Sequence, residues 1–307
     1  MTDSKVFLSI IIAAHNSEGT LAATLQSLTA ACNHDLSGTE IILINDSSTD
    51  KTQDIIQDFS NLHAQVKAYQ VDYRNIGQVR QFAVEKSSGD YITMLDSDDL
   101  LKKSALTEII KFLKENKPDL LLTKLEEVWN REKINYQWSG LTPEKITRNE
   151  AIRRFLIHKD LQAHLIGQFI KRELYLAHKF PPMTCYEDFY IFPGMLNNAH
   201  EIYFQHHSLY YYIKNRGSLS SLLNEDKISN LIICTAKMES ILPAKFKQLI
   251  LCHWLDIYIK HRKKLNDAEQ LNMVQQHVFM THTPAFFFNR FVRFSYKKKA
   301  LSTLWKK

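Results

Sequence analysis

The first part of the sequence predicts a doubly wound α/β fold with a Rossmann-like, nucleotide-binding half. The runs "LSIIIAA" and "EIILIN" are almost continuously apolar, as strands covered on both faces of a parallel sheet are. Strand and helix patterns alternate over about the first 125 residues, which is typical of βαβ units. From about residue 222 the pattern is mostly helical, so we expect a helical C-terminal extension.

Five segments rich in β-favouring residues are predicted strands, and the first four are each followed by apolar residues at helical spacing. The predicted strands are residues 6–13, 40–44, 66–71, 91–95 and 119–123. The helical patterns are Leu21/Leu25/Leu28, Ile55/Ile56/Phe59, Val79/Phe82/Ala83 and Leu106/Ile109/Ile110/Leu113. Polar segments follow the first, second and fourth strands. Since such sheets bind ligands at the carboxyl ends of their strands, we expect a site there.

Composition and length indicate an ordinary globular protein. Hydrophobic residues make up 45% of the 307 residues and charged residues 23%. The four cysteines are dispersed, which argues against a zinc cluster or a disulfide framework and favours a cytoplasmic location. The first apolar run is brief and follows Asp3, so we interpret it as a strand and not as a secretion signal. No stretch approaches the roughly 20 apolar residues of a spanning helix.

Three carboxylates close the fourth predicted strand, in "GDYITMLDSDD". In an extended chain Asp96 and Asp98 leave the same face, and such a pair suits Mn²⁺ or Mg²⁺ that shares a substrate phosphate. The other interpretation is that Asp98 or Asp99 caps the helix that begins near Lys102. The residues alone leave both open.

A carboxylate also ends the second predicted strand, in "LINDSSTDKTQDII". Asp46 could accept hydrogen bonds from a base or ribose. The segment can also be a helix start, with Ser47, Ser48 or Thr49 as the cap and Asp50 in the first turn. Both interpretations can hold, because they use different residues.

Phosphate binding by a glycine-rich loop is excluded. The chain has eight glycines and contains neither G-x-G-x-x-G nor a P-loop, so side chains and a metal would have to hold any phosphate. The segment "YRNIGQVRQF" places Asn75, Gly77 and Arg80 before the acidic strand. The fork of Arg80 suits a diphosphate, although an exposed helix arginine explains it equally well.

These segments, in this order, resemble family 2 glycosyltransferases with the GT-A fold. "SIIIAAHN", "EIILINDSSTDKT" and "NIGQVRQFAVEKSSGDYITMLDSDD" are similar to the nucleotide-sugar half. "GQFIKRELYLAHKFPPMTCYEDFYIFPGML" and "YYYIKNRGSLS" are similar to the acceptor half of bacterial capsule, lipopolysaccharide and O-antigen members. The resemblance covers about residues 6–221. It implies a mixed sheet and three parts: a donor half (1–125), an acceptor half (126–221) and a helical region (222–307).

The resemblance also implies a UDP-sugar donor and a hydroxyl of a glycan or lipid-linked glycan as acceptor. Asp98, with Asp96, is implied to hold Mn²⁺ or Mg²⁺. The implied donor-binding residues are Ala13, Ala14, His15, Asn16, Glu18, Asp46, Asn75, Gly77, Arg80, Asp96 and Ser97. Family members often have Pro-Tyr at Ala14-His15 and Asp-Asp at Asn45-Asp46, so base stacking differs in this chain.

In "YEDF" the resemblance implies Asp188 as the catalytic base, with Glu187 beside it. One base and one displacement predict inversion at the anomeric carbon, while the metal balances charge on the leaving diphosphate. The segment could also be only a helix start with acidic first-turn residues. In "KNRGS", Lys214, Asn215 and Arg216 form either a loop that closes over the diphosphate or a solvated turn.

The C-terminal tail is strongly basic. From Gln270 onward there are seven basic residues and no acidic one, within a net charge of +6. Aromatic residues alternate with these cations over residues 286–307, which suits an anionic membrane surface on the inner face of the cytoplasmic membrane. A helix that packs its aromatics on the body is the alternative. A non-catalytic protein acting through this tail on membrane or nucleic acid is the rival function, although no nucleic-acid module is recognised.

Overall fold

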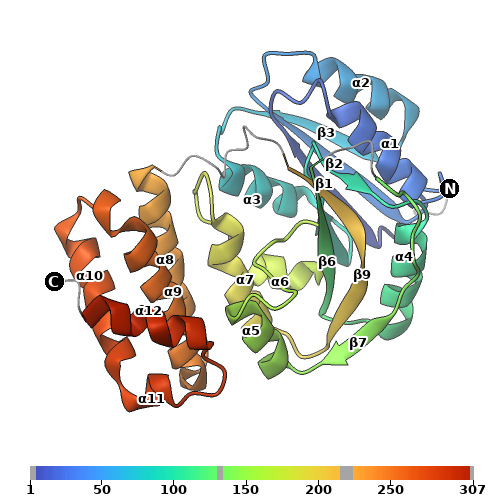
Figure 1. Cartoon of the computed structure of the whole chain (residues 1–307). Coiled ribbons are helices and arrows are strands. Elements are labelled where there is room, and N and C mark those ends of the chain that lie inside the picture. The colour runs from blue at the N-terminus through green and yellow to red at the C-terminus, as the bar shows by residue number, and fades with distance from the viewer. Residues whose placement is uncertain (1–4, 130–133, 215–223, 305–307) are drawn as a thin grey trace.

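A computed structural model describes residues 5–129, 134–214 and 224–304. Within these residues nine strands form one mixed sheet, in the order β3-β2-β1-β4-β8-β6-β9-β5 with β7 paired to β9. Figure 1 shows this sheet between two layers of helices, with further helices outside one layer. The predicted fold class, an α/β sheet followed by a helical C-terminal region, is confirmed.

All five predicted strands form. They are β1 (Leu8–Ala14), β2 (Thr39–Asp46), β3 (Val66–Val71), β4 (Tyr91–Met94) and β6 (Leu120–Val128). β1 pairs in parallel with β2 and β4, and β2 pairs in parallel with β3. The apolar side chains of β1 and β2 are almost completely buried, as strands covered on both faces require.

The other strands join the sheet mostly in antiparallel pairs. They are β5 (Leu100–Leu101), β7 (Pro143–Ile146), β8 (Phe169–Lys171) and β9 (Ile202–Ile213). β8 pairs antiparallel with both β4 and β6, while β9 runs parallel to β6 and antiparallel to β5. The predicted boundary at 125/126 therefore falls inside β6, and the two predicted halves share one sheet. The predicted boundary at 221/222 lies outside the described residues.

Helices cover both faces of the sheet (Figure 1). One layer contains α1 (Leu21–Ala31), α2 (Thr52–Leu62) and α4 (Ala105–Asn116). The other contains α3 (Ile76–Lys86), α5 (Arg148–Leu156), α6 (Arg172–Ala177) and α7 (Glu187–Asn198). The four helices predicted between the first strands, α1 to α4, are thus confirmed.

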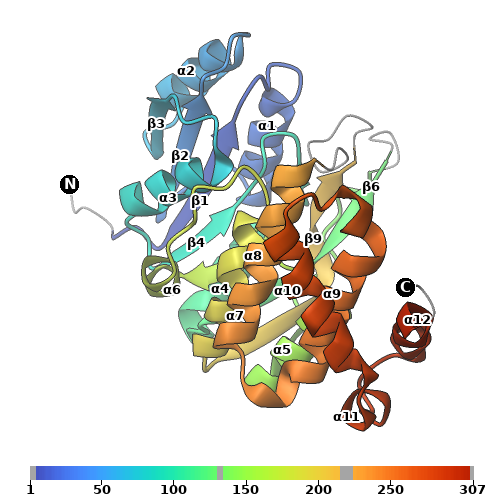
Figure 2. The same cartoon turned by 90° about the vertical axis from the view of Figure 1, so that its left-hand side faces the viewer.

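The C-terminal helices form an outer layer, best seen in Figure 2. They are α8 (Glu225–Ile241), α9 (Lys247–His261), α10 (Ala268–Phe279), α11 (Pro284–Phe287) and α12 (Phe294–Leu304), with 3₁₀ turns at Ala244–Phe246, Arg262–Lys264 and Met280–His282. α8 packs on α7, α9 on α8 and α10 on α9. The indole of Trp254 is fully buried in this layer and donates to Glu239 (2.9 Å). Over the described part of the chain, no helix is long and apolar enough to span a membrane.

Gly77 lies where α3 passes closest to the segment that leads into α7. Its N–H donates to the backbone oxygen of Met183 (3.1 Å). A Cβ at this position would lie 2.0 Å from the backbone oxygen of Pro181, which is closer than atoms can approach. The glycine thus allows a close backbone contact between the two predicted halves of the chain.

We predict that Gly77→Ala destabilises the protein, because backbone atoms must shift to admit the methyl group. The free energy of unfolding should fall by about 1–3 kcal/mol in urea denaturation. Gly19→Ala is the control, since a Cβ at Gly19 meets nothing within 4 Å. Equal stability of the two variants would contradict this close-packing explanation.

Candidate active site

The loops that follow β1, β2 and β4 are joined by side-chain hydrogen bonds. Asn16 accepts from the Thr49 N–H (2.8 Å) and donates its own N–H to Ser48 Oγ (3.0 Å). The hydroxyls of Ser17 and Ser97 lie 2.8 Å apart. The three polar segments therefore converge at one edge of the sheet, as the sequence predicts.

Asp46 is buried at this edge and organises the chain that follows β3. Its Oδ1 accepts from the backbone N–H groups of Tyr73 (2.8 Å) and Arg74 (2.9 Å). The Nδ1–H of His15 donates to the backbone oxygen of Asp46 (2.6 Å). Asp46 and the predicted donor-binding segment after β1 are thus in contact.

The segment leads into a helix, as predicted, but the predicted caps are wrong. α2 begins at Thr52, and no side chain of Ser47, Ser48 or Thr49 caps it. Asp50 instead precedes the helix and accepts from the Thr52 N–H (3.0 Å). The other oxygen of Asp50, Oδ2, accepts from the Glu18 N–H (3.0 Å). Asp50 therefore joins the loop after β1 to the start of α2.

Arg80 is buried between two acidic segments that are far apart in sequence. Its guanidinium pairs through Nη1 with Glu187 and through Nη2 with Asp96 Oδ1 (3.1 Å). The arginine side chain is 8% exposed, so the exposed-helix alternative is wrong. Arg80 joins the loop after β4 to the start of α7.

The two carboxylates at the start of α7 differ in their surroundings. Glu187 is almost fully buried and pairs with Arg80, whereas the Asp188 side chain is 22% exposed. Asp188 Oδ1 accepts from the Phe189 N–H (2.7 Å), as expected at a helix start. Burial raises the pKa of Asp188 to about 6, and the nearby charge of Arg80 opposes this shift. Burial also raises the pKa of Glu187, against the effect of its partner Arg80.

His164 is a neighbour of Asp188 that the sequence did not reveal. Its Nδ1 lies 3.9 Å from Asp188 Oδ2, and its Nε2 lies 3.0 Å from Gln162 Oε1. Burial lowers the pKa of His164, which favours the neutral ring. A single histidine in a loop has no distinctive spacing, so no motif could have identified it.

Asp99 has a structural role that differs from the predicted helix cap. It is fully buried, and it accepts from the Tyr210 hydroxyl (2.7 Å) and from the Ile213 N–H (2.7 Å) of β9. The same hydroxyl accepts from the Asp96 N–H (3.0 Å). α4 begins only at Ala105, with Ser104 at its N-cap, so the interpretation of Asp98 or Asp99 as its cap is wrong. Burial raises the pKa of Asp99 to about 8.

Asp96 and Asp98 offer a small oxygen donor set for a metal. Both are half-buried, and one oxygen of Asp96 is already bound to Arg80. Among the residues that the structure describes, no group of three or more His, Cys, Asp or Glu side chains could hold a metal ion. Two carboxylates fit an ion that takes its other ligands from substrate phosphates and water, as Mg²⁺ and Mn²⁺ do.

The other predicted donor-binding residues lie around this edge with local partners. Ala13 and Ala14 end β1. Glu18 Oε2 accepts from the Lys51 N–H (3.0 Å). Asn75 caps α3 by accepting from the Gln78 N–H (3.1 Å).

The predicted diphosphate loop is described only at its start. Lys214 follows β9 and pairs with Glu127 of β6 (3.2 Å). Asn215 and Arg216 lie outside the described residues. The role of this segment stays a prediction.

Comparisons with a family model and with curated proteins all give glycosyltransferases. The family model for glycosyl transferase family 2 matches residues 9–166. The chain is 28% identical over 145 residues to poly(ribitol-phosphate) beta-N-acetylglucosaminyltransferase TarS of Staphylococcus aureus, covering 47% of this chain and 25% of that protein. It is 28% identical over 196 residues to an uncharacterized glycosyltransferase of Haemophilus influenzae, covering 62% and 72% respectively. The chain thus spans about a quarter of the length of the staphylococcal relative.

A solved structure shares the fold. S. aureus TarS 1-349 in complex with UDP-GlcNAc matches with a TM-score of 0.70 and 19% identity, covering 98% of this chain and 92% of that chain. The GT-A fold implied by the resemblance is confirmed.

We predict that Arg80→Met lowers the free energy of unfolding by about 3–5 kcal/mol. The substitution keeps most of the side-chain volume but leaves Glu187 and Asp96 without their shared cation. Denaturant unfolding measures the loss. Arg74→Met is the control, because Arg74 is 75% exposed and its pair with Asp72 (3.4 Å) should contribute less than about 1 kcal/mol.

The double variant Arg80→Met/Glu187→Gln tests the cause of the loss. Removing the uncompensated charge should restore part of the stability, because the glutamine is neutral. A double variant less stable than Arg80→Met alone would contradict the proposed charge compensation.

Proposed function

The chain belongs to glycosyl transferase family 2, and we propose that it is an inverting, metal-dependent enzyme that transfers a sugar from a UDP-sugar to a hydroxyl of a bacterial surface glycan. The observation that carries this proposal is the bridge from Arg80 to Asp96 and Glu187. It brings the acidic loop after β4 next to Asp188, so the proposed leaving-group site and the proposed base are neighbours.

The donor class is supported by the relatives. TarS was solved with UDP-GlcNAc, and the name of TarS describes transfer of N-acetylglucosamine to poly(ribitol-phosphate). We infer that the edge formed by His15, Asn16 and Asp46 holds the uridine part. The second oxygen of Asp46 and the half-exposed loop around Asn16 would supply its hydrogen-bond partners. Hexosyl and N-acetylhexosaminyl donors are the first to test.

Arg80 would not contact the diphosphate directly, but would position another residue that does. Its guanidinium is occupied by two carboxylates, so its proposed role is to hold Asp96 beside the phosphates. Asp98, with Asp96, would hold Mn²⁺ or Mg²⁺. A divalent ion bound there would neutralise negative charge that develops on the departing UDP.

Asp188 is the proposed general base. It would accept the proton of the acceptor hydroxyl as that oxygen attacks the anomeric carbon and the bond to UDP breaks. Glu187 is a poor candidate because it is buried and paired with Arg80. With one base and one displacement, the configuration at the anomeric carbon inverts.

His164 would assist this base as a neutral neighbour. With its Nε2–H donating to Gln162, its Nδ1 is an acceptor that faces Asp188. A neutral ring adds no positive charge that would hold Asp188 in its ionised form, so Asp188 can take up the proton of the acceptor hydroxyl.

We predict metal-dependent UDP release with one sugar of a UDP-sugar panel. Activity should fall by about 100-fold or more with excess chelator, and Mn²⁺ or Mg²⁺ should restore it. Asp98→Asn should show a comparable loss, whereas Asp54→Asn on the exposed start of α2 should not. Full activity in chelator would exclude the metal-dependent mechanism.

We predict that Asp188→Asn lowers turnover by about 10²–10⁴-fold without weakening UDP-sugar binding, because the amide cannot accept the proton. Turnover by the wild type should fall about tenfold per unit as the pH drops below about 6, where Asp188 becomes protonated, and should level off above pH 7. Coupled detection of UDP measures turnover and its pH dependence, and calorimetry measures UDP-sugar binding.

Asp58→Asn, an exposed carboxylate of α2, is the matched control and should retain the wild-type rate and pH profile. An Asp188→Asn protein with wild-type turnover would exclude Asp188 as the base. Absence of both turnover and UDP binding in the wild type would instead favour the non-catalytic rival.

A further inference from the structure

Helix α12 has an inner face that is fixed to the protein body. The hydroxyl of Tyr296 (2.8 Å) and the ammonium of Lys299 (2.7 Å) both donate to Asp256 of α9. Ala300 is fully buried, and the Thr303 hydroxyl lies 2.9 Å from His282 Nε2. The sequence-based alternative of a helix packed on the body is therefore confirmed for this face.

The outer face of α12 carries large apolar side chains in water. Phe294 is 70% exposed, Leu301 48% and Leu304 50%. Lys297 and Lys298 lie between them at the i+3 and i+4 positions, so the five side chains share one side of the helix. Both views place α12 at the outer surface of the helical layer, away from the central sheet (Figures 1 and 2).

Two further aromatic residues of the C-terminal helical layer are exposed. Phe288, just after α11, is 87% exposed, and Phe279, at the end of α10, is 75% exposed. In contrast Phe286 is fully buried and Phe287 is half-buried. Phe286 and Phe287 are therefore not available to a membrane, so the predicted membrane segment of residues 286–307 is shorter than the sequence indicates. Trp305, Lys306 and Lys307 lie outside the described residues.

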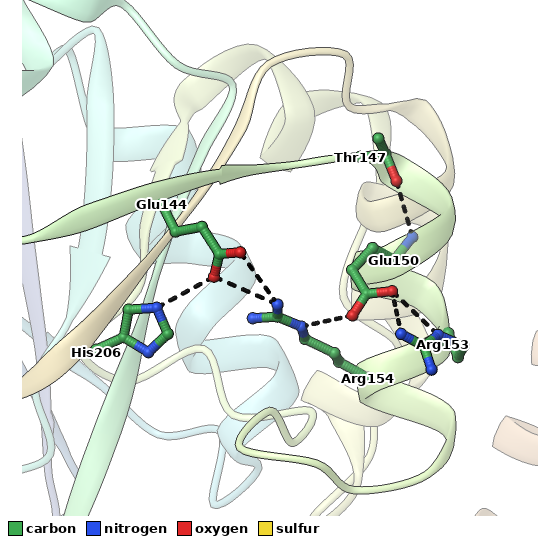
Figure 3. Close-up of polar contacts among 6 residues, drawn as sticks. All are labelled: Glu144, Thr147, Glu150, Arg153, Arg154 and His206. Atoms are coloured by element: carbon green, nitrogen blue, oxygen red, sulfur yellow. Dashed lines mark hydrogen bonds and ion pairs between the residues drawn. The ribbon is translucent and has the colours of Figure 1, made fainter. Parts of the chain in front are cut away.

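A polar network on α5 fixes the corner that leads into α12. Figure 3 shows Glu150 between Arg153 and Arg154, with Arg154 also paired to Glu144 (3.3 Å). The guanidinium of Arg153, held in this way, lies over the ring of Phe291 at 4.8 Å. Arg293 donates to the backbone oxygen of Ile157, at the end of α5. The segment that leads into α12 is thus tied to α5.

The exposed charges on α12 itself are all positive. No acidic residue occurs between Gln270 and the end of the chain. The nearest acidic partner of α12, Asp256, is compensated by Lys299 and Lys260. Lys297 and Lys298 therefore present positive charge beside the exposed apolar side chains.

We propose that this outer face of α12 docks on an anionic lipid surface. Exposed Phe and Leu side chains flanked by cations suit the boundary between head groups and acyl chains, where the apolar groups enter and the ammonium groups meet lipid phosphates. Nucleic acid would match the charge but would leave Leu301 and Leu304 in water. This consequence rests on the proposed function: docking would hold the enzyme beside a lipid-linked acceptor.

The test is flotation of the purified chain with vesicles of phosphatidylcholine, with and without 30% phosphatidylglycerol. We expect binding only to the anionic vesicles, and weaker binding at high salt. Lys297→Gln/Lys298→Gln should weaken partitioning about 30-fold. Phe294→Ser/Leu301→Ser should weaken it about tenfold.

Lys111→Gln/Lys114→Gln is the matched control, because it removes the same charge from the exposed side of α4 and should bind like the wild type. Binding is read without donor or acceptor, and Asp188→Asn should bind like the wild type, so failure of the proposed enzyme activity does not affect the result. Equal binding to neutral vesicles, equal loss in the control, or binding to duplex DNA but not to anionic vesicles would overturn the proposal.

Discussion

The buried charge of Arg80 constrains the whole candidate site. A guanidinium taken out of water must be compensated, and here two carboxylates compensate it: Asp96 after β4 and Glu187 at the start of α7. These residues belong to the first and second parts of the chain. Glu187 of the second part is paired with Arg80 of the first part, so placement of the start of α7 and assembly of the site depend on each other.

The neighbouring interactions reinforce this constraint from two sides. Gly77 lets α3 approach the backbone before α7, which brings Arg80 within reach of Glu187. Tyr210 of β9 accepts from the Asp96 N–H and donates to Asp99, which fixes the acidic loop on the sheet. The acidic cluster is tolerated because its members have different roles. Asp96 pairs with Arg80, Asp99 is a buried hydrogen-bond acceptor, and Asp98 is the proposed metal ligand.

Local patterns predicted much of this structure, and long-range contacts explain most of what they missed. Continuous apolar runs identified β1 and β2, and the polar segments after them identified the edge where the loops meet. Short strands such as β5 and β8 carry too little pattern to be recognised and exist because of their partners in the sheet. The interpretation of Asp99 as a cap failed because its acceptor role depends on Tyr210 and Ile213, which are remote in sequence. The composition of the tail fits both a helix packed on the body and a helix exposed to solvent. In the structure α12 does both, because one side packs on α9 and the opposite side is exposed.

The insertion of β8 between β4 and β6 has a consequence for how this scaffold can change. Because each half of the chain supplies neighbours to the other within the sheet, the proposed acceptor half cannot be exchanged between relatives as an independent module. A chimera joined near β6 would combine strands that have not adapted to one another, and would disturb the partners of Arg80 and Asp99 together. Diversification of this scaffold is therefore expected to proceed through the loops that follow its strands, with the interleaved sheet inherited as a unit.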